Sequence, residues 1–248
     1  MTYKLYLGNR LYFSWSIAIT PEGAVLNDSM AIAEELANRH PDIAFWPTDP
    51  LARGTARALA NEMHASFGGL RGAWPVNLRT AHATVTPPDT ITAELDRIEE
   101  IWTHARKVTG AVGPWLCGEY SLVDAIFAPM ATRLATYGFD TRPTTKAYVA
   151  AHLADPSLRR WRAMGLANEQ TLAAFETDLP EVPWRGPTPM NAVAVETGTP
   201  ENDACPYSGL PITHLLSMDG RIFGFCNAFC RDKTVHDPAV WPQFVALL

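Results

Sequence analysis

Apolar and polar residues alternate briefly at the start of the chain and then recur with a helical period over most of its length. The segment 27–40 predicts a helix that Asp28 or Ser29 caps at its N-terminus. Before that helix, the pattern predicts a strand at 3–7, a turn or loop at 8–16, and a turn with a short strand at 20–26.

A proline-rich connection at 41–50 leads into a long helical region that starts near Leu51. Apolar residues recur there at spacings of four, four and three, as on one face of a helix: Leu59, Met63, Phe67 and Leu70. Further helices are predicted at 86–107, 121–138, 143–156 and 156–176. Ser121 and Asp124 form a capping-box pattern at the start of one of them.

The composition changes after about residue 177. The next segment is rich in proline and has little periodicity, which indicates a semi-extended linker that can pack on the helical region through Val182 and Trp184. Three of the four cysteines follow it. The sequence therefore predicts four parts: an α/β part at 1–45, an all-helical domain at 46–177, a linker at 178–203 and a cysteine module at 204–248.

Composition is that of an ordinary globular chain, since 47% of its 248 residues are apolar and 19% are charged. The net charge of −6 and the lack of a Lys/Arg block argue against nucleic acid and anionic membranes as partners. The sequence shows neither a long apolar run nor a signal-peptide pattern, and four cysteines do not make a disulfide framework. We therefore expect a cytoplasmic protein, in which clustered cysteines are metal ligands or redox groups.

Several motifs within 1–177 resemble those of the glutathione transferases. They are "LGNRLYFSWS" near the N-terminus, "AVLNDSMAIAEEL" around the first helix, "WPTDPLARGTARALANEMHASFGGLR" in the helical region, and "WLCGEYSLVDAIFAP" across the start of the helix at 121–138. The first and third are similar to a serine-type bacterial branch of that family. The resemblance implies a thioredoxin-like N-terminal domain, an all-helical second domain, a homodimer, and a small electrophile that reacts with glutathione.

In that family, the γ-glutamyl end of glutathione binds at a helix start that corresponds to Asp28 and Ser29 in this sequence. A helix N-terminus offers backbone N–H groups to a carboxylate, Ser29 adds a hydroxyl, and Asp28 can hold an amino group. The alternative is that both residues only cap the helix.

The N-terminal half departs from the family pattern. It is much shorter than a complete thioredoxin-like domain, and a helix, a strand, a second helix and the cis-proline loop have no counterpart before Ile19. Two interpretations are open: either the deletion is real and the glutathione site is impaired, or the polypeptide is longer than this sequence around 17–19.

The residue that activates glutathione is also uncertain. In serine-type members a hydroxyl before the first helix donates a hydrogen bond to the glutathione thiolate, which lowers the pKa of the thiol. The matching position is Phe13, so Ser14 is the catalytic candidate, with Tyr12 and Ser16 as alternatives and a cap as the structural role of Ser14. Polar residues expected near the electrophile pocket are Glu62, His64, Arg71, Asn77 and Arg79.

The cysteine module has its own pattern. Two apolar runs flank Asp219–Gly220, which predicts a hairpin, and Cys226 and Cys230 follow at a spacing that puts both sulfurs on one side of a helix turn. The hairpin would bring Cys205 close to that pair, so three thiolates could hold one ion. The lone Cys117 is expected to be a buried small hydrophobe.

This module resembles the TRASH and YHS families of treble-clef-like metal-binding modules, in the cysteine spacing and in Asp237–Pro238 after the helix. The resemblance implies zinc or another soft metal, such as copper(I), on Cys205, Cys226 and Cys230. A fourth cysteine in a C-x-x-C pattern would sit at position 208, which is Ser208, so His214 and His236 are the remaining candidates for a fourth ligand. A three-sulfur site with an open position is the alternative. The alternatives are that the cysteines are merely buried, or that two of them form a redox pair.

Two functions follow, and the sequence leaves open whether the chain is an enzyme. In the first, it is a glutathione transferase-like protein that acts on a small electrophile and carries a metal-binding tail. In the second, it is a non-catalytic scaffold of the same fold whose cysteine module binds or senses a soft metal.

Overall fold

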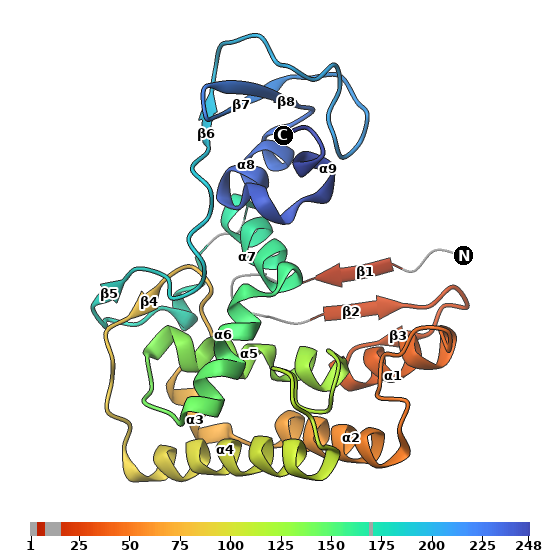
Figure 1. Ribbon diagram of the computed structural model, residues 1–248, viewed down its shortest axis with the longest axis vertical. Helices are drawn as coiled ribbons and strands as arrows, with labels where there is room; N and C mark the ends of the chain where they lie inside the picture. Colours follow the sequence, from red (N-terminus) through yellow and green to blue (C-terminus); the bar gives the residue numbers. More distant parts are fainter. Residues whose placement is uncertain (1–3, 8–15, 169–170) are drawn as a thin grey trace. The chain divides into compact units, whose positions relative to one another are not determined.

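The computed structural model describes residues 4–7, 16–168 and 171–248 (Figure 1). The chain divides into two compact units, each made of two segments. Unit 1 comprises Met1–His152 and Leu172–Arg185, and unit 2 comprises Leu153–Thr171 and Gly186–Leu248.

Unit 1 begins with a three-stranded antiparallel sheet in the order β1-β2-β3, followed by helix α1. Its elements are β1 (Lys4–Leu7), β2 (Ser16–Ile19), β3 (Val25–Leu26) and α1 (Ser29–Arg39). The strands β1 and β3 and the helix α1 are confirmed, with Asp28 as the cap. The central strand β2 was not predicted, because four residues that start inside an expected loop carry too little alternation.

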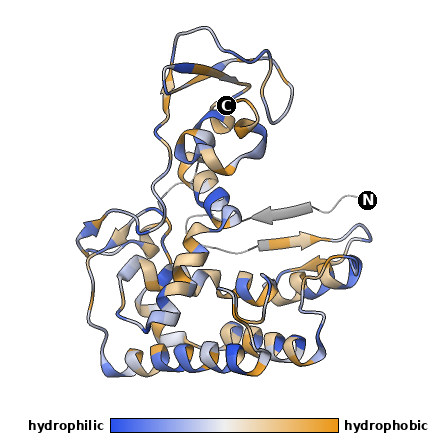
Figure 2. Cartoon of the chain, in the orientation of Figure 1, coloured by the Kyte–Doolittle hydropathy of each residue, from blue (hydrophilic) through white to orange (hydrophobic). Residues whose placement is uncertain are grey.

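The rest of unit 1 is a helical body with a common apolar core. Its helices are α2 (Pro50–Ala65), α3 (Gly68–Ala73), α4 (Asp89–Thr109), α5 (Leu122–Tyr137) and α6 (Pro143–Ala154). Apolar and polar residues alternate around α4 in Figure 2, as expected for a helix with one buried face. Tyr137, Tyr148 and Phe127 are among the largest fully buried side chains of the core.

The predicted helix through Leu70 is wrong at one point, where α2 ends and α3 begins. Phe67 has a left-handed backbone, with φ of 62°, yet its side chain stays buried in the core. Arg71 stabilises this break by donating to the carbonyl oxygens of His64 and Ser66. The apolar spacing did not reveal the break, because Phe67 and Leu70 reach the same core from both sides of it.

Part of the predicted linker belongs to unit 1. Strand β5 (Glu181–Val182) pairs with β4 (Ala81–His82), with Val182 opposite Ala81. Arg185 follows and donates to backbone carbonyls near the C-terminus of α5 and to that of His82. The predicted packing of Val182 and Trp184 on the helices themselves stays a prediction.

Unit 2 contains a second three-stranded antiparallel sheet, in the order β6-β7-β8, and short helices. Its elements are α7 (Pro156–Asn168), β6 (Val193–Val195), β7 (His214–Met218), β8 (Arg221–Phe225), α8 (Ala228–His236), the 3-10 turn Pro238–Val240 and α9 (Pro242–Val245). The predicted hairpin is confirmed, with positive φ at both Asp219 and Gly220. Another 3-10 turn, Ala173–Phe175, lies in unit 1.

Helix α7 packs against α8 inside unit 2. Arg159 binds Asp237 through two hydrogen bonds of 2.9 and 2.8 Å, and Arg160 donates to the carbonyl of Val240. Packing therefore groups this helix with the cysteine module, although the sequence places it in the all-helical domain. The predicted domain boundaries themselves stay predictions.

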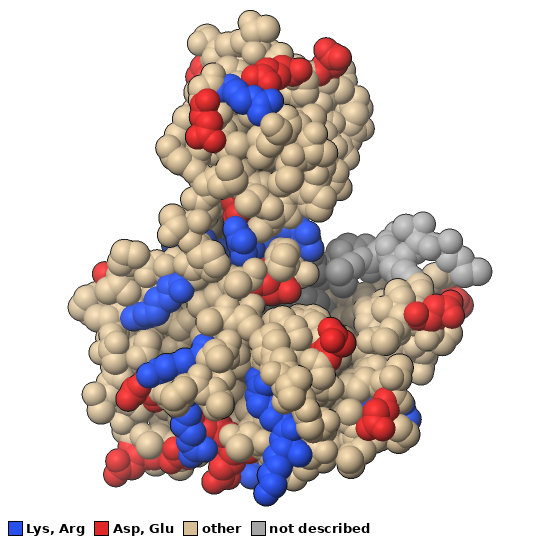
Figure 3. Space-filling model, in the orientation of Figure 1, with Lys and Arg blue, Asp and Glu red and all other residues tan. Residues whose placement is uncertain are grey.

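The predicted fold class is confirmed in its parts: a small α/β part, a helical body and a small C-terminal module with clustered cysteines. Acidic and basic side chains are interspersed on the face of the helical body shown in Figure 3. None of the helices among the described residues has the length and apolar character needed to span a membrane.

Candidate functional site

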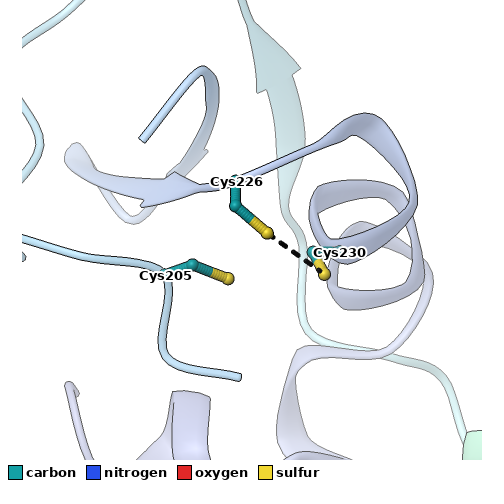
Figure 4. Close-up of side chains that lie close together, drawn as sticks. All are labelled: Cys205, Cys226 and Cys230. Atoms are coloured by element: carbon teal, nitrogen blue, oxygen red, sulfur yellow. Dashed lines mark hydrogen bonds between the residues drawn. The ribbon is translucent and has the colours of Figure 1, made fainter. Parts of the chain in front are cut away.

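The three cysteines of unit 2 form a cluster. The Sγ atoms of Cys205, Cys226 and Cys230 all lie within 4.8 Å of one another, and the Cys226 and Cys230 sulfurs are 3.9 Å apart (Figure 4). Three sulfurs that bind one ion at about 2.3 Å each stand about 3.8–4.0 Å apart. The cluster therefore needs only a small contraction to close on one ion.

A tight turn positions Cys205. The Cys205 carbonyl accepts from the N–H of Gly209, and the Cys205 N–H donates to the carbonyl of Leu210. Gly209 has φ of 69°, a conformation that glycine adopts without strain. The turn leaves the Cys205 side chain buried and directs its sulfur towards the start of α8.

The start of helix α8 positions the other two cysteines. Asn227 caps the helix by accepting from the N–H of Cys230 at 2.8 Å, and its amide donates to the Cys226 sulfur at 3.3 Å. The same side chain thus fixes the helix start and contributes a hydrogen bond to one thiolate. Such partners orient metal ligands and tune their basicity.

The electrostatics of the cluster favour one thiolate. Burial raises the pKa of Cys205, but hydrogen bonds from the backbone of Cys226 and of the turn, together with the Ser208 hydroxyl, outweigh it and lower that pKa to about 6. Burial, a hydrogen bond with Cys226 and the charge of neighbouring thiolates raise the pKa of Cys230 to about 11. Three adjacent thiolates repel one another, so only a cation can hold all three ionised.

The residues considered for the fourth ligand position differ in how close they lie to the three sulfurs. Among the described residues, the cluster of ligand atoms within 4.8 Å contains the three cysteines and neither His214 nor His236. His214 instead shares a hydrogen bond of 2.8 Å with the Thr213 hydroxyl. Ser208, at the position where a C-x-x-C cysteine would sit, borders the cluster, since its hydroxyl lies 3.2 Å from the Cys226 sulfur.

Lys233 lies on α8 beside the cluster, in an aromatic setting. Its ammonium is 3.6 Å from the ring centre of Tyr207 and 4.3 Å from that of Trp241. Burial lowers the pKa of Lys233, while the charges of the three cysteines oppose that shift. This lysine can therefore balance negative charge on the thiolates.

The residues assigned to glutathione are only partly brought together. Asp28 accepts from the N–H groups of Met30 and Ala31 at 2.8 and 3.1 Å, and its other oxygen lies 3.0 Å from Nε2 of His64. Ser29 is the exposed first residue of α1. Ser14 lies outside the described residues, as do Phe13 and Tyr12.

The polar residues expected near the electrophile pocket have structural partners. Glu62 forms an ion pair with Arg97, and Arg71 binds the two carbonyls at the α2–α3 break. Asn77 accepts from the backbone N–H of Arg79. These contacts account for Glu62, Arg71 and Asn77 without a ligand.

Unit 1 also contains a buried cysteine, Cys117, and a small cavity. The Cys117 side chain is buried in the core, as predicted, and burial raises its pKa to about 12. A cavity of about 200 Å³ is lined by Trp102, Thr103, Arg106, Thr144, Thr145 and Tyr148. Its volume is below the range of pockets that enclose drug-sized ligands.

Sequence reasoning missed three residues at these sites: Asn227, Lys233 and the partner role of His64. Asn227 directly precedes a helix start, and this position is a signal for a cap. The contacts of Lys233 and His64 join residues far apart in the sequence, so only the structure could reveal them.

No family model matches the chain, and no curated protein matches it. The solved structures that resemble it include glutathione transferases. A glutathione transferase homolog from Burkholderia gl BGR1, with bound glutathione, is 23% identical, with a TM-score of 0.43 over 60% of this chain and 71% of that chain.

Two further structures are similar at the same level. A glutathione transferase from Methylococcus capsulatus strain Bath is 18% identical, with a TM-score of 0.45 over 62% of this chain and 74% of that chain. A glutathione S-transferase from Rhodospirillum rubrum F11 is 18% identical, with a TM-score of 0.42 over 67% and 74%. Likenesses of this strength do not assign an activity or a substrate to the chain.

Proposed function

We propose that unit 2 binds one soft metal ion through the thiolates of Cys205, Cys226 and Cys230. The observation that carries this proposal is the convergence of the three sulfur atoms within 4.8 Å of one another. Thiolate sulfur is a soft donor, so zinc and copper(I) are the ions that suit the site. We propose in the same way that the cysteine module is a metal-binding module of the TRASH or YHS type.

The hydrogen bonds around the sulfurs support a metal site over three merely buried thiols. The Asn227 amide and the Ser208 hydroxyl both donate to the Cys226 sulfur. Donors that point at sulfur stabilise a thiolate, whereas a buried neutral thiol needs none. A module this small also has a limited core, so a bound ion would contribute to its folding.

Metal analysis combined with native and denaturing mass spectrometry tests the proposal. We expect one zinc or copper(I) ion per chain in the native protein and none after denaturation. Cys226→Ser should weaken metal binding by at least about 100-fold, because it removes a ligand and not merely a supporting hydrogen bond. Cys117→Ala is the matched control, since that cysteine lies in the core of unit 1. A metal-free native protein with a Cys226–Cys230 disulfide after mild oxidation would support the redox pair instead.

A second candidate function is glutathione-dependent chemistry on a small electrophile in unit 1. The observation that favours it is the pairing of Asp28 and His64 beside the exposed Ser29 at the start of α1. In this proposal unit 1 is a shortened thioredoxin-like domain with the helical domain of a serine-type glutathione transferase. Ser29 binds the γ-glutamyl carboxylate, Asp28 the amino group, and Ser14 the thiolate. Cytoplasmic location and a homodimer are part of the same proposal.

Titration calorimetry with glutathione and an assay with a model electrophile test this second function. We expect Ser29→Ala to weaken glutathione binding and Ser14→Ala to lower the rate with binding retained. The cysteine variants of unit 2 serve as controls that should leave both unchanged. If no glutathione binding is measurable at millimolar concentration, the transferase function is refuted. The chain would then be the non-catalytic scaffold with a metal-binding module.

A further inference from the structure

We propose that the three-thiolate site is open on the side of Ser208, and that the bound ion takes its fourth ligand from a small-molecule thiol. This inference rests on the proposed metal binding of unit 2. It assigns to the site a second ligand class beyond the ion, and it assigns to Ser208 the role of keeping the fourth position open.

The position of Ser208 in the turn carries the first step. Cys205 and Ser208 are three residues apart in the segment Cys205–Gly209, and the turn closes through the hydrogen bond from Gly209 to Cys205. In a turn of this kind, a second cysteine at the third position would complete a four-sulfur site. Here the side chain is a hydroxyl, and it lies 3.2 Å from the Cys226 sulfur.

The exposure of the cluster carries the second step. Cys205 is only 2% exposed, but Cys226 and Cys230 are half-buried and Ser208 is exposed. The cluster is therefore closed on the Cys205 side and reachable from solvent on the Ser208 side. Among the described residues, the ligand-atom cluster offers no histidine or carboxylate to occupy the fourth position.

Donor chemistry decides what fills that position. A neutral hydroxyl is a hard and weak ligand for an ion that three thiolates already hold, and Ser208 also uses its hydroxyl to support Cys226. A further thiolate matches the softness of the ion and of the other donors. A small thiol that diffuses in from solvent can supply it without any movement of the fold.

The charge near the site is compatible with a fourth thiolate. Four thiolates around a divalent ion carry a net charge of −2, which is costly without a nearby cation. Lys233, whose ammonium packs on the rings of Tyr207 and Trp241, supplies a positive charge next to the cluster. The two rings hold the Lys233 side chain in this position, so its charge does not have to be brought in when the thiol binds.

The test loads the full chain with cobalt(II) under anaerobic conditions and follows the sulfur-to-cobalt charge-transfer band. The intensity of this band grows with the number of bound thiolates, so glutathione should raise it by about one third as three thiolates become four. S-Methylglutathione, which has no thiol, should leave the band unchanged. Ser208→Ala loses the hydrogen bond to the Cys226 sulfur and should bind cobalt more weakly, but glutathione should still raise its band because the fourth position stays open.

Ser208→Cys is the decisive variant. It should start with the four-thiolate intensity, ignore glutathione, and release its ion to a chelator more slowly than the parent. A parent band that is unchanged or weakened by glutathione while cobalt is bound would overturn the open-site proposal. Failure of the parent to bind cobalt or zinc at all would instead refute the metal site itself, so the two failures are distinguishable.

Discussion

At the scale of single residues, Asp124 shows how burial and hydrogen bonding oppose each other. Its carboxylate is fully buried and accepts from the N–H of Leu116, the N–H of Ser121 and the hydroxyl of Tyr148, at 3.0–3.1 Å. Burial raises its pKa to about 6, although these three hydrogen bonds favour the ionised form. Asp124 therefore holds the start of α5 by hydrogen bonds, and its contribution to the free energy of unfolding depends on pH.

The sign of this dependence is opposite to that of an ordinary carboxylate. The pKa of Asp124 is about 6 in the folded chain and about 3.9 in the unfolded chain, so the folded state binds the proton more tightly. Its contribution to stability is greatest well below pH 4 and falls as the pH rises, by about 3 kcal/mol in total once the pH is well above 6. Above about pH 7 the contribution should be nearly constant.

Asp124→Asn isolates this effect, because the amide does not titrate. Urea unfolding of unit 1 between pH 4 and 7 should show the stability of the parent falling relative to that of the variant by about 2 kcal/mol. The variant should be less stable overall at pH 4, since the amide meets donor groups with its own N–H₂. A difference that is the same at every pH would contradict the raised pKa.

At the scale of elements, strand β8 fits its neighbours through one glycine. A Cβ atom on Gly224 would lie 2.3 Å from Cδ1 and 2.6 Å from Cγ2 of Ile212, closer than real contacts allow. The backbone of Gly224 also exchanges two hydrogen bonds with the Asn202 side chain. Ile212, which precedes β7, thus packs directly on the backbone of β8 at Gly224, where any side chain would keep it further away.

Gly224→Ala should lower the stability of unit 2 by about 1–3 kcal/mol, the usual cost of overpacking. Ile212→Ala removes the atoms that collide, so the double variant should be closer to Ile212→Ala than the sum of both changes predicts. Thermal unfolding of the three proteins measures this coupling. Additive effects would mean that the strand moves aside instead of colliding.

The elements also show what sequence alone could predict. The cysteine spacing and the turn at Asp219–Gly220 predicted the hairpin and the metal-ligand candidates, because both signals are local. The end of α2 at Phe67 was missed, since apolar spacing carries no information on a left-handed residue. Whether Ser14 activates a thiol lies outside the described residues and stays a prediction.

At the scale of the whole molecule, unit 2 is assembled from two separate segments of the chain. Helix α7 contributes Ala163 to the same buried cluster as Cys205 and Phe225. The ion pair between Arg159 and the buried Asp237 joins the two segments. The sequence predicted a helix at 156–176 within the all-helical domain but could not name the surface that covers it, because helical periodicity carries no information on the partner.

Hydrogen exchange with and without bound zinc tests this assembly. An ion that binds only the folded form stabilises the unit that holds it, by about 2.7 kcal/mol at 100 times the dissociation constant. Protection should therefore rise in α7 as well as in residues 205–236, and it should not change in α2 or α4. If zinc slows amide exchange around the cysteines but leaves exchange in α7 unchanged, the helix is not coupled in stability to the rest of unit 2.

The two-segment build of unit 2 also has a consequence for synthesis on the ribosome. Helix α7 is made well before Asp237 and Val240, to which its arginines bind. At about 5–20 residues per second, the roughly 70 intervening residues take on the order of 4–14 s. During that interval the nascent helix lacks the buried cluster of unit 2 that Ala163 joins in the folded chain.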